Sequence, residues 1–216
     1  MVDGGNGSDT VIYIGRSATG VDLDLQGQFC QENLFGVELQ MPDDTMLPGF
    51  ERDKLHSIEI AYGTEYGDWL YGNDEDNVLV GLGGNDLLLP GTGYDILNGG
   101  KGNDTYLLDS AKGTVTIVNY ATDGALDKAS MTYANMADLR YEKVGNDLVV
   151  RSIDIRYPVF FDEQQPTVIF KDWFVDSVLY HHVYIQANDG MIKLEALERE
   201  GKKAEERNTL SMEAKN

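Results

Sequence analysis

Gly81-Leu-Gly-Gly-Asn-Asp-Leu-Leu-Leu89 is the third of five nonapeptides that follow one another, without insertion, from Gly63 to Leu107. Position six of a copy is Asp in four of the five, and position eight is Leu in four of the five. The exceptions are Asn77 at position six and Tyr106 at position eight. A period this strict predicts a repeat architecture, in which each copy is one structural unit that stacks on its neighbours.

Each copy joins a tight turn to a short strand. Glycine allows the backbone to adopt positive φ and to turn sharply. The residues after position six then alternate as in a strand, with position eight directed into a core. Two copies make one coil of about 18 residues, with a strand on each side. The sequence therefore predicts an all-β fold, a parallel β-roll, in which turns two copies apart stack on the same side.

This stacking places acidic side chains above one another. Asp68, Asp86 and Asp104 share one side, and Asn77 and Asp95 share the other. Stacked carboxylates repel one another unless a cation lies between them. Hard oxygen ligands in a cage of six or more suit Ca²⁺. We therefore expect about three calcium ions: two on the first side and one, held more weakly because Asn77 is neutral, on the second.

Backbone carbonyls complete the predicted sites. The turns direct the carbonyl oxygens of positions two and four toward a shared concavity, where they add hard ligands to the carboxylates. The turn with Thr64 and Tyr66 at these positions is expected to be distorted. The predicted backbone ligands are Leu82, Gly84, Gly91, Gly93, Gly100 and Gly102.

The pattern divides the chain into four parts. A separate copy near the start places Asp9, which we also expect to be a metal ligand, at position six. It has no stacked partner at the expected spacing, so its turn is expected to pair with coils outside this chain. From residue 191 the pattern becomes helical and highly charged. The expected parts are degenerate β-roll coils at 3–62 with an insertion at about 26–52, the nonapeptide roll at 63–110, a β-rich capping module at 111–190, and a short charged helix and tail at 191–216.

Charge and composition exclude several classes of function. The formal net charge of −20 disfavours nucleic acid and anionic lipid as partners. No apolar run approaches the roughly 20 residues that a membrane helix needs. Cys30 is the only cysteine, so an intrachain disulfide is impossible. The sequence contains no nucleophile–base arrangement and no zinc motif, so we expect no enzymatic activity.

The nonapeptides resemble those of the RTX (repeats-in-toxin, haemolysin-type) calcium-binding family, found in exported bacterial toxins, proteases, lipases and adhesins. Gly4 to Leu25 and Ser57 to Gly63 look like the degenerate coils that often precede such arrays. Leu139 to Gly190 resembles the module that often follows them. The resemblance implies an RTX β-roll in a larger parent protein, exported by a type I secretion system and folding on calcium binding outside the bacterial cell.

Two functions from different classes remain open. The first is a non-catalytic, calcium-dependent folding and secretion module of a large toxin or related exoprotein. The second is a calcium-dependent binding domain of an adhesin, which would recognise glycan or peptide. Trp69, Trp173 and the tyrosines could form such a surface, although core and strand positions are the simpler interpretation of them.

Overall fold

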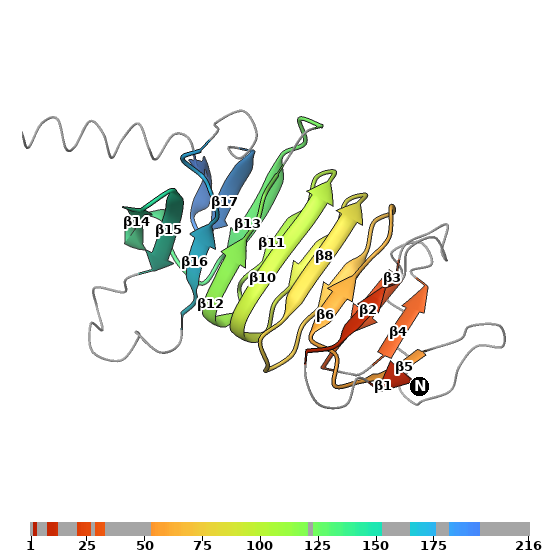
Figure 1. Cartoon of the computed structure of the whole chain (residues 1–216). Coiled ribbons are helices and arrows are strands. Elements are labelled where there is room, and N and C mark those ends of the chain that lie inside the picture. Colours follow the sequence, from red (N-terminus) through yellow and green to blue (C-terminus); the bar gives the residue numbers. More distant parts are fainter. Residues whose placement is uncertain are drawn as a thin grey trace, which may run out of the picture.

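Two β-sheets face each other and enclose one hydrophobic core in the computed structural model of the chain (Figure 1). The structure describes residues 2–3, 8–12, 21–26, 29–32, 53–120, 123–152, 165–175 and 182–194. No helix in these ranges is long and apolar enough to cross a membrane. The fold is all-β, as predicted, with a single 3₁₀ turn at Met136–Asp138 among the described residues.

The first sheet has ten strands and contains every second strand of the nonapeptide block. Its strands in spatial order are β1 (Val2–Asp3), β5 (Asp53–His56), β4 (Phe29–Glu32), β3 (Val21–Asp24), β7 (Trp69–Tyr71), β9 (Leu87–Leu89), β11 (Thr105–Leu107), β13 (Asp127–Met131), β17 (Val183–Ala187) and β18 (Gly190–Lys193).

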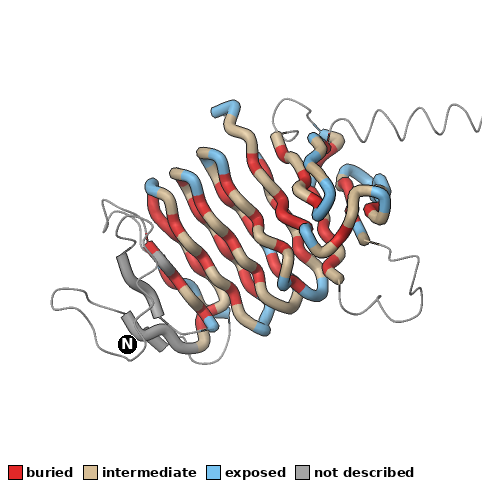
Figure 2. Tube along the Cα trace, turned by 180° about the vertical axis from the view of Figure 1, so that it is seen from behind, coloured by how far each residue is buried: buried red, intermediate tan, exposed pale blue. Residues whose placement is uncertain are grey.

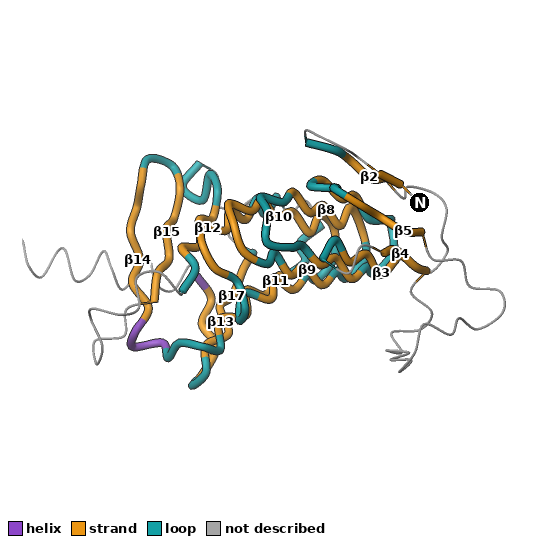
Figure 3. The backbone as a smooth tube through the Cα atoms, turned by 90° about the horizontal axis from the view of Figure 1, so that it is seen from below, coloured by secondary structure: helices purple, strands orange, loops and turns teal. Residues whose placement is uncertain are grey.

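The second sheet has eight strands and contains the other strands of the block. Their order is β14 (Leu139–Val144), β15 (Asp147–Ser152), β16 (Thr167–Phe170), β12 (Lys112–Ile117), β10 (Thr92–Lys101), β8 (Val78–Gly83), β6 (Ile60–Tyr62) and β2 (Thr10–Ile12). Figure 3 shows β8 and β10 in one layer and β9 and β11 in the other.

Strands two copies apart pair in parallel and in register. Leu70 lies beside Leu88, Leu88 beside Tyr106, and Leu79 beside Leu97. Each of these pairs is 18 residues apart, which is the spacing of one coil. The predicted parallel β-roll is therefore confirmed.

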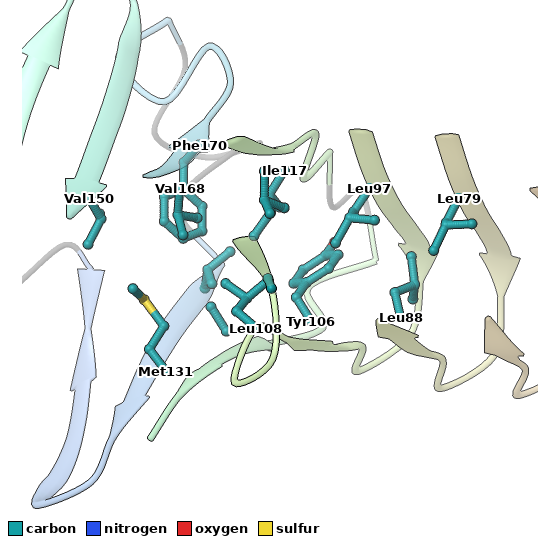
Figure 4. Close-up of a cluster of buried hydrophobic side chains, with 14 of the residues drawn as sticks. Leu79, Leu88, Leu97, Tyr106, Leu108, Ile117, Met131, Val150, Val168 and Phe170 are labelled. Atoms are coloured by element: carbon teal, nitrogen blue, oxygen red, sulfur yellow. The ribbon is translucent and has the colours of Figure 1, made fainter. Parts of the chain in front are cut away.

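The core is a row of position-eight side chains. Leu70, Leu79, Leu88, Leu97 and Tyr106 have no exposed surface. Figure 4 shows Leu79, Leu88, Leu97 and Tyr106 in line between the two sheets. Burial alternates along the strands, as Figure 2 shows, because successive side chains of a strand point to opposite faces.

The same pairing continues beyond the nonapeptides. Ile117 stacks on Leu97 and Phe170 on Ile117, while Ala129 stacks on Tyr106 and Ile185 on Ala129. Residues after 111 therefore extend the core of the roll. The hairpins β14–β15 and β17–β18 run antiparallel and end the two sheets, and Gly145 has positive φ in the turn of the first hairpin.

The C-terminal segment differs from the expectation in one respect. Met191–Lys193 belongs to strand β18 and does not begin a helix. The turn at 188–189 folds this segment back onto β17, where Ile192 pairs with Ile185 and packs against the core. Tertiary pairing here overrides the local helical pattern. Most of the predicted helix and tail (195–216) and most of the insertion (33–52) lie outside the described residues.

Candidate metal centre

Four aspartates form a continuous stack on one side of the roll. The backbone N–H of Asp68 donates to Oδ1 of Asp86 at 2.8 Å, and that of Asp86 donates to Oδ1 of Asp104 at 2.9 Å. The N–H of Asp104 donates in the same way to Oδ1 of Asp127 at 2.8 Å. In Asp86, Asp104 and Asp127, Oδ1 is thus held in place by a backbone N–H of the preceding coil. The structure brings together Asp68, Asp86 and Asp104, as the spacing predicts.

The opposite side of the roll carries the second predicted stack. The N–H of Asn77 donates to Oδ1 of Asp95 at 3.0 Å. Both side chains are buried, with 1 % of their surface exposed. The stack does not continue past Asp95, because Val115 takes the next position in the register and points into the core.

The second oxygen of several stacked carboxylates is buried and has no partner. Oδ2 of Asp86, Asp95, Asp104 and Asp127 accepts no hydrogen bond. An unpaired buried carboxylate oxygen is costly, so it indicates a missing cationic ligand. In the turns ending at Asp86, Asp95 and Asp104, positions two and four all have positive φ, which identifies the sharp turns expected from the sequence. These residues are Leu82, Gly84, Gly91, Gly93, Gly100 and Gly102.

At two of these aspartates, Asp86 and Asp104, a side chain at position one of the turn would fill the space beside the unpaired Oδ2. A Cβ atom added to Gly81 would overlap Oδ2 of Asp86 and approach the carbonyl oxygen of Gly99 in the next turn at 2.5 Å. A Cβ atom added to Gly99 would overlap Oδ2 of Asp104 in the same way. The spaces beside Oδ2 of Asp86 and Oδ2 of Asp104, called cradles below, are therefore kept open by glycine, and the cradle of Asp86 is also lined by the carbonyl oxygen of Gly99. Such an all-oxygen donor set fits Ca²⁺ and does not fit zinc.

Burial raises the pKa values of the stacked carboxyl groups. The pKa of Asp86 rises to about 9, because burial removes the carboxylate from water and because Asp104 and Asp68 lie nearby. Burial likewise raises the pKa of Asp104 to about 8 and that of Asp95 to about 7. No cationic side chain of the described residues lowers the pKa of these three groups. A divalent cation in the cradles would supply a counter-charge.

Asp68 and Asn77 are placed differently from the other members of their stacks. Oδ2 of Asp68 accepts a hydrogen bond from the N–H of Thr64 at 2.6 Å, and Oδ1 accepts one from the N–H of Val21 at 2.5 Å. Oδ1 of Asn77 accepts one from the N–H of Asn73 at 2.7 Å. Both residues occupy their predicted positions, but their ligand oxygens already have donors.

Asp127 is a member of the stack that the repeat pattern did not predict. It lies 23 residues after Asp104, because the turn between them is longer than in the repeats, and a fixed 18-residue period misses it. The segment Asp127-Lys-Ala129 keeps the local pattern of position six followed by a buried position eight, which is the signal that could have found it.

Asp9 does have a stacked neighbour, contrary to the expectation. Its N–H donates to Oε2 of Glu59 at 2.8 Å, and β2 pairs in parallel with β6. Glu59 takes position six of a coil that precedes the nonapeptides, and the insertion separates the two residues by 50 positions. Oδ2 of Asp9 is buried and unpaired, but residues 4–7 of its turn lie outside the described residues.

Side chains alone do not assemble a metal site in the described part of the chain. No group of three or more His, Cys, Asp or Glu side chains is arranged there to hold an ion. Beside Asp86, the unpaired carboxylate oxygen and the carbonyl oxygen of Gly99 in the next turn border the same space. The backbone would therefore supply most of the ligands.

Comparison with known families agrees with this geometry. Residues 62–97 and 91–111 match the RTX calcium-binding nonapeptide repeat, in four copies. The match includes all three turns that carry an unpaired Oδ2 within the nonapeptide block. It ends at residue 111, so the resemblance of Leu139 to Gly190 to a module that follows such repeats stays a prediction. No curated protein matches the chain.

Proposed function

Because residues 62–111 of this chain belong to the RTX calcium-binding nonapeptide repeat family, we propose that the chain is a calcium-dependent folding module of a larger exported protein. One observation carries the proposal: Oδ2 of Asp86, of Asp95 and of Asp104 is buried without a partner, and the space beside that of Asp86 is also bordered by the carbonyl oxygen of Gly99 in the next turn. Binding of calcium by these repeats follows from the family. The three ions and their assignment are part of the proposal.

The residues of the chain perform three tasks in this function. Glycine at position one keeps the cradles of Asp86 and Asp104 open, and the N–H of the preceding coil orients each carboxylate through Oδ1. The apolar residues of position eight join the coils into one core. Bound calcium supplies the positive charge that the stacked carboxylates lack, so that binding and folding become coupled.

The coupling between calcium binding and folding explains why such a module would fold only after export. Extracellular calcium modules bind at Kd values of roughly 10⁻⁴–10⁻³ M. An ion that binds only the folded state stabilises it by about 2.7 kcal/mol at a hundredfold excess over Kd. In the calcium-poor bacterial cytosol the acidic chain would stay unfolded and ready for a type I secretion channel. The family resemblance supports this role, as does the net charge of −20. No catalytic role is proposed.

A second candidate is a calcium-dependent binding domain of an adhesin. Aromatic and aliphatic side chains occupy the outer faces of both sheets: Trp69 and Tyr71 flank the buried Leu70 on β7, and Tyr94 and Ile96 are exposed on β10. Aromatic side chains on a flat face suit stacking against glycans. A glycan array probed with and without calcium separates the two candidates, because only the adhesin function requires a calcium-dependent ligand.

A calcium titration followed by circular dichroism tests the main proposal. We expect calcium to increase the β-sheet signal and the Tm, magnesium to have little effect, and a chelator to reverse the change. The variant Asp86→Asn should weaken the response, because it removes a charge from the cradle. Glu142→Gln removes an equal charge from the exposed β14–β15 hairpin and should leave the response unchanged. An equally stable fold in excess chelator would contradict the proposal.

A further inference from the structure

The roll contains two kinds of turn on its position-six stacks. In the open turns, 82–86, 91–95 and 100–104, positions two and four have positive φ and Oδ2 of the aspartate is unpaired. In the capped turns, 64–68 and 73–77, positions two and four do not have positive φ, and an N–H of the turn occupies the side-chain oxygen of position six. The two kinds occupy different parts of the chain, and the capped turns come first.

Thr64 closes the first capped turn. Its N–H donates to Oδ2 of Asp68 at 2.6 Å, and its hydroxyl lies 3.1 Å and 3.3 Å from the two carboxylate oxygens. The N–H of Tyr66 donates to the same hydroxyl at 3.0 Å. Thr64 therefore fills the space that remains beside the carboxylate in the open turns. Thr64 itself is buried.

Asn73 closes the second capped turn with the same pattern. Its N–H donates to Oδ1 of Asn77 at 2.7 Å, and its own Oδ1 accepts from the N–H of Glu75 at 2.8 Å. Nδ2 of Asn77 is buried without a partner, but an amide nitrogen is a donor and offers nothing to a cation. Thr64 and Asn73, both at position two, thus make the same contact: the backbone N–H of each donates to the side chain at position six of its turn.

This arrangement is incompatible with a bound ion. A backbone N–H directed at the carboxylate oxygen carries a partial positive charge and takes the place that a cation would need. It also stabilises the carboxylate, whose other oxygen accepts a hydrogen bond from the N–H of Val21. The turn is complete without metal.

We propose that the capped turns hold no calcium and that ions enter only at the open turns, so that residues 63–77 form a metal-independent start to a metal-dependent roll. This inference depends on the proposed calcium binding. It replaces the prediction, made from spacing alone, that Asp68 and Asn77 are ligands. The ions would lie beside Asp86 and Asp104 on one side and beside Asp95 on the other, with Asp127 next to the last cradle of the first stack.

Calcium stoichiometry, measured by isothermal titration calorimetry on the full chain, tests the inference. Asp68→Asn and Asp104→Asn are a matched pair, since each removes one charge from the same stack. We expect Asp68→Asn to bind as many ions as the unmodified chain, with Kd values within about twofold. We expect Asp104→Asn to lose at least one ion or to weaken its binding by about tenfold or more.

A gain-of-site variant makes the test independent of any loss of stability in Asp68→Asn. The double substitution Thr64→Gly and Tyr66→Gly removes the hydroxyl that holds the capped turn and allows positions two and four to adopt the positive φ of the open turns, which turns the N–H of residue 64 away from Asp68. It should bind one ion more than the unmodified chain. Loss of an ion in Asp68→Asn, or no extra ion in the double variant, would overturn the inference alone. An unmodified chain that binds no calcium would overturn the proposed function and the inference together.

Discussion

Tyr106 is the one polar side chain at position eight, and its hydroxyl has a structural use. The hydroxyl accepts a hydrogen bond from the N–H of Gly99 at 3.1 Å and donates to Oδ1 of Asn119 at 3.4 Å. Gly99 is the glycine that keeps open the cradle beside Asp104. The hydroxyl therefore holds in place a turn that borders a proposed calcium site. Burial raises the pKa of the Tyr106 hydroxyl well above its usual value, which keeps the hydroxyl protonated.

Replacement of Tyr106 by Phe should destabilise the roll by about 1–3 kcal/mol, because a buried N–H would lose its acceptor while the packing volume is nearly conserved. Urea denaturation at saturating calcium measures this change. Tyr94→Phe is the matched control, since Tyr94 is 73 % exposed, and should change the free energy of unfolding by less than about 0.5 kcal/mol. Equal effects of the two substitutions would show that the buried hydroxyl contributes nothing.

At the level of elements, the strands, the stacks and the irregular turn at Thr64 and Tyr66 follow from the sequence, while the longer turn before Asp127 and the hydrogen bonds that cap two turns do not. Position eight fixes which face of a strand is buried, and the nine-residue period fixes the partner, so the order from Trp69 to Leu107 could be predicted. Asp127 could not, because a longer turn shifts it out of phase. The caps at Thr64 and Asn73 were equally hidden, because they depend on side-chain hydrogen bonds that compete with the glycine turn.

We expect the turn before β13 to take part in calcium binding through Asp127, which the nine-residue period does not indicate. Its Oδ1 accepts a hydrogen bond from the N–H of Asp104, and its Oδ2 is buried without a hydrogen-bond partner. Asp127→Asn keeps an acceptor oxygen in place and removes one charge beside the last cradle. We expect the affinity of one calcium ion to fall by about tenfold, since ligand charge tunes such sites. Calorimetric titration measures the fall, and Asp138→Asn, outside the stacks, is the control. Unchanged affinity in Asp127→Asn would remove Asp127 from the site.

For the whole molecule, the distribution of open and capped turns confines the proposed calcium sites to the later coils of the roll. Buried negative charge is concentrated from Asp86 to Asp127, where each stacked carboxylate keeps one oxygen without a hydrogen-bond partner. The coils around Asp68 and Asn77 are closed by their own hydrogen bonds. Since every coil shares one core with the next, calcium bound in the later coils stabilises the earlier ones as well.

Protons and calcium should compete for the same oxygens, which makes the stability of the roll depend on pH. Burial raises the pKa of Asp127 and Asp68 to about 6, that of Asp95 to about 7, that of Asp104 to about 8 and that of Asp86 to about 9, all above the value of 3.8 for a solvated Asp. The calcium-free folded state thus binds protons more tightly than the unfolded state. Its stability is highest at low pH and is lost as the pH rises through about 6 to about 9.

Calcium reverses this dependence, because its ligands must be deprotonated. We expect the Tm in chelator to fall between pH 5.5 and pH 9, and the calcium affinity to rise over the same range by up to about tenfold per pH unit for each proton displaced. Calorimetry in two buffers of different ionisation enthalpy counts the protons released. In Asp86→Asn the count should be smaller, because the group with the highest pKa of the stack is absent. An affinity that does not change between pH 5.5 and pH 8 would show that calcium binds elsewhere than at the buried carboxylates.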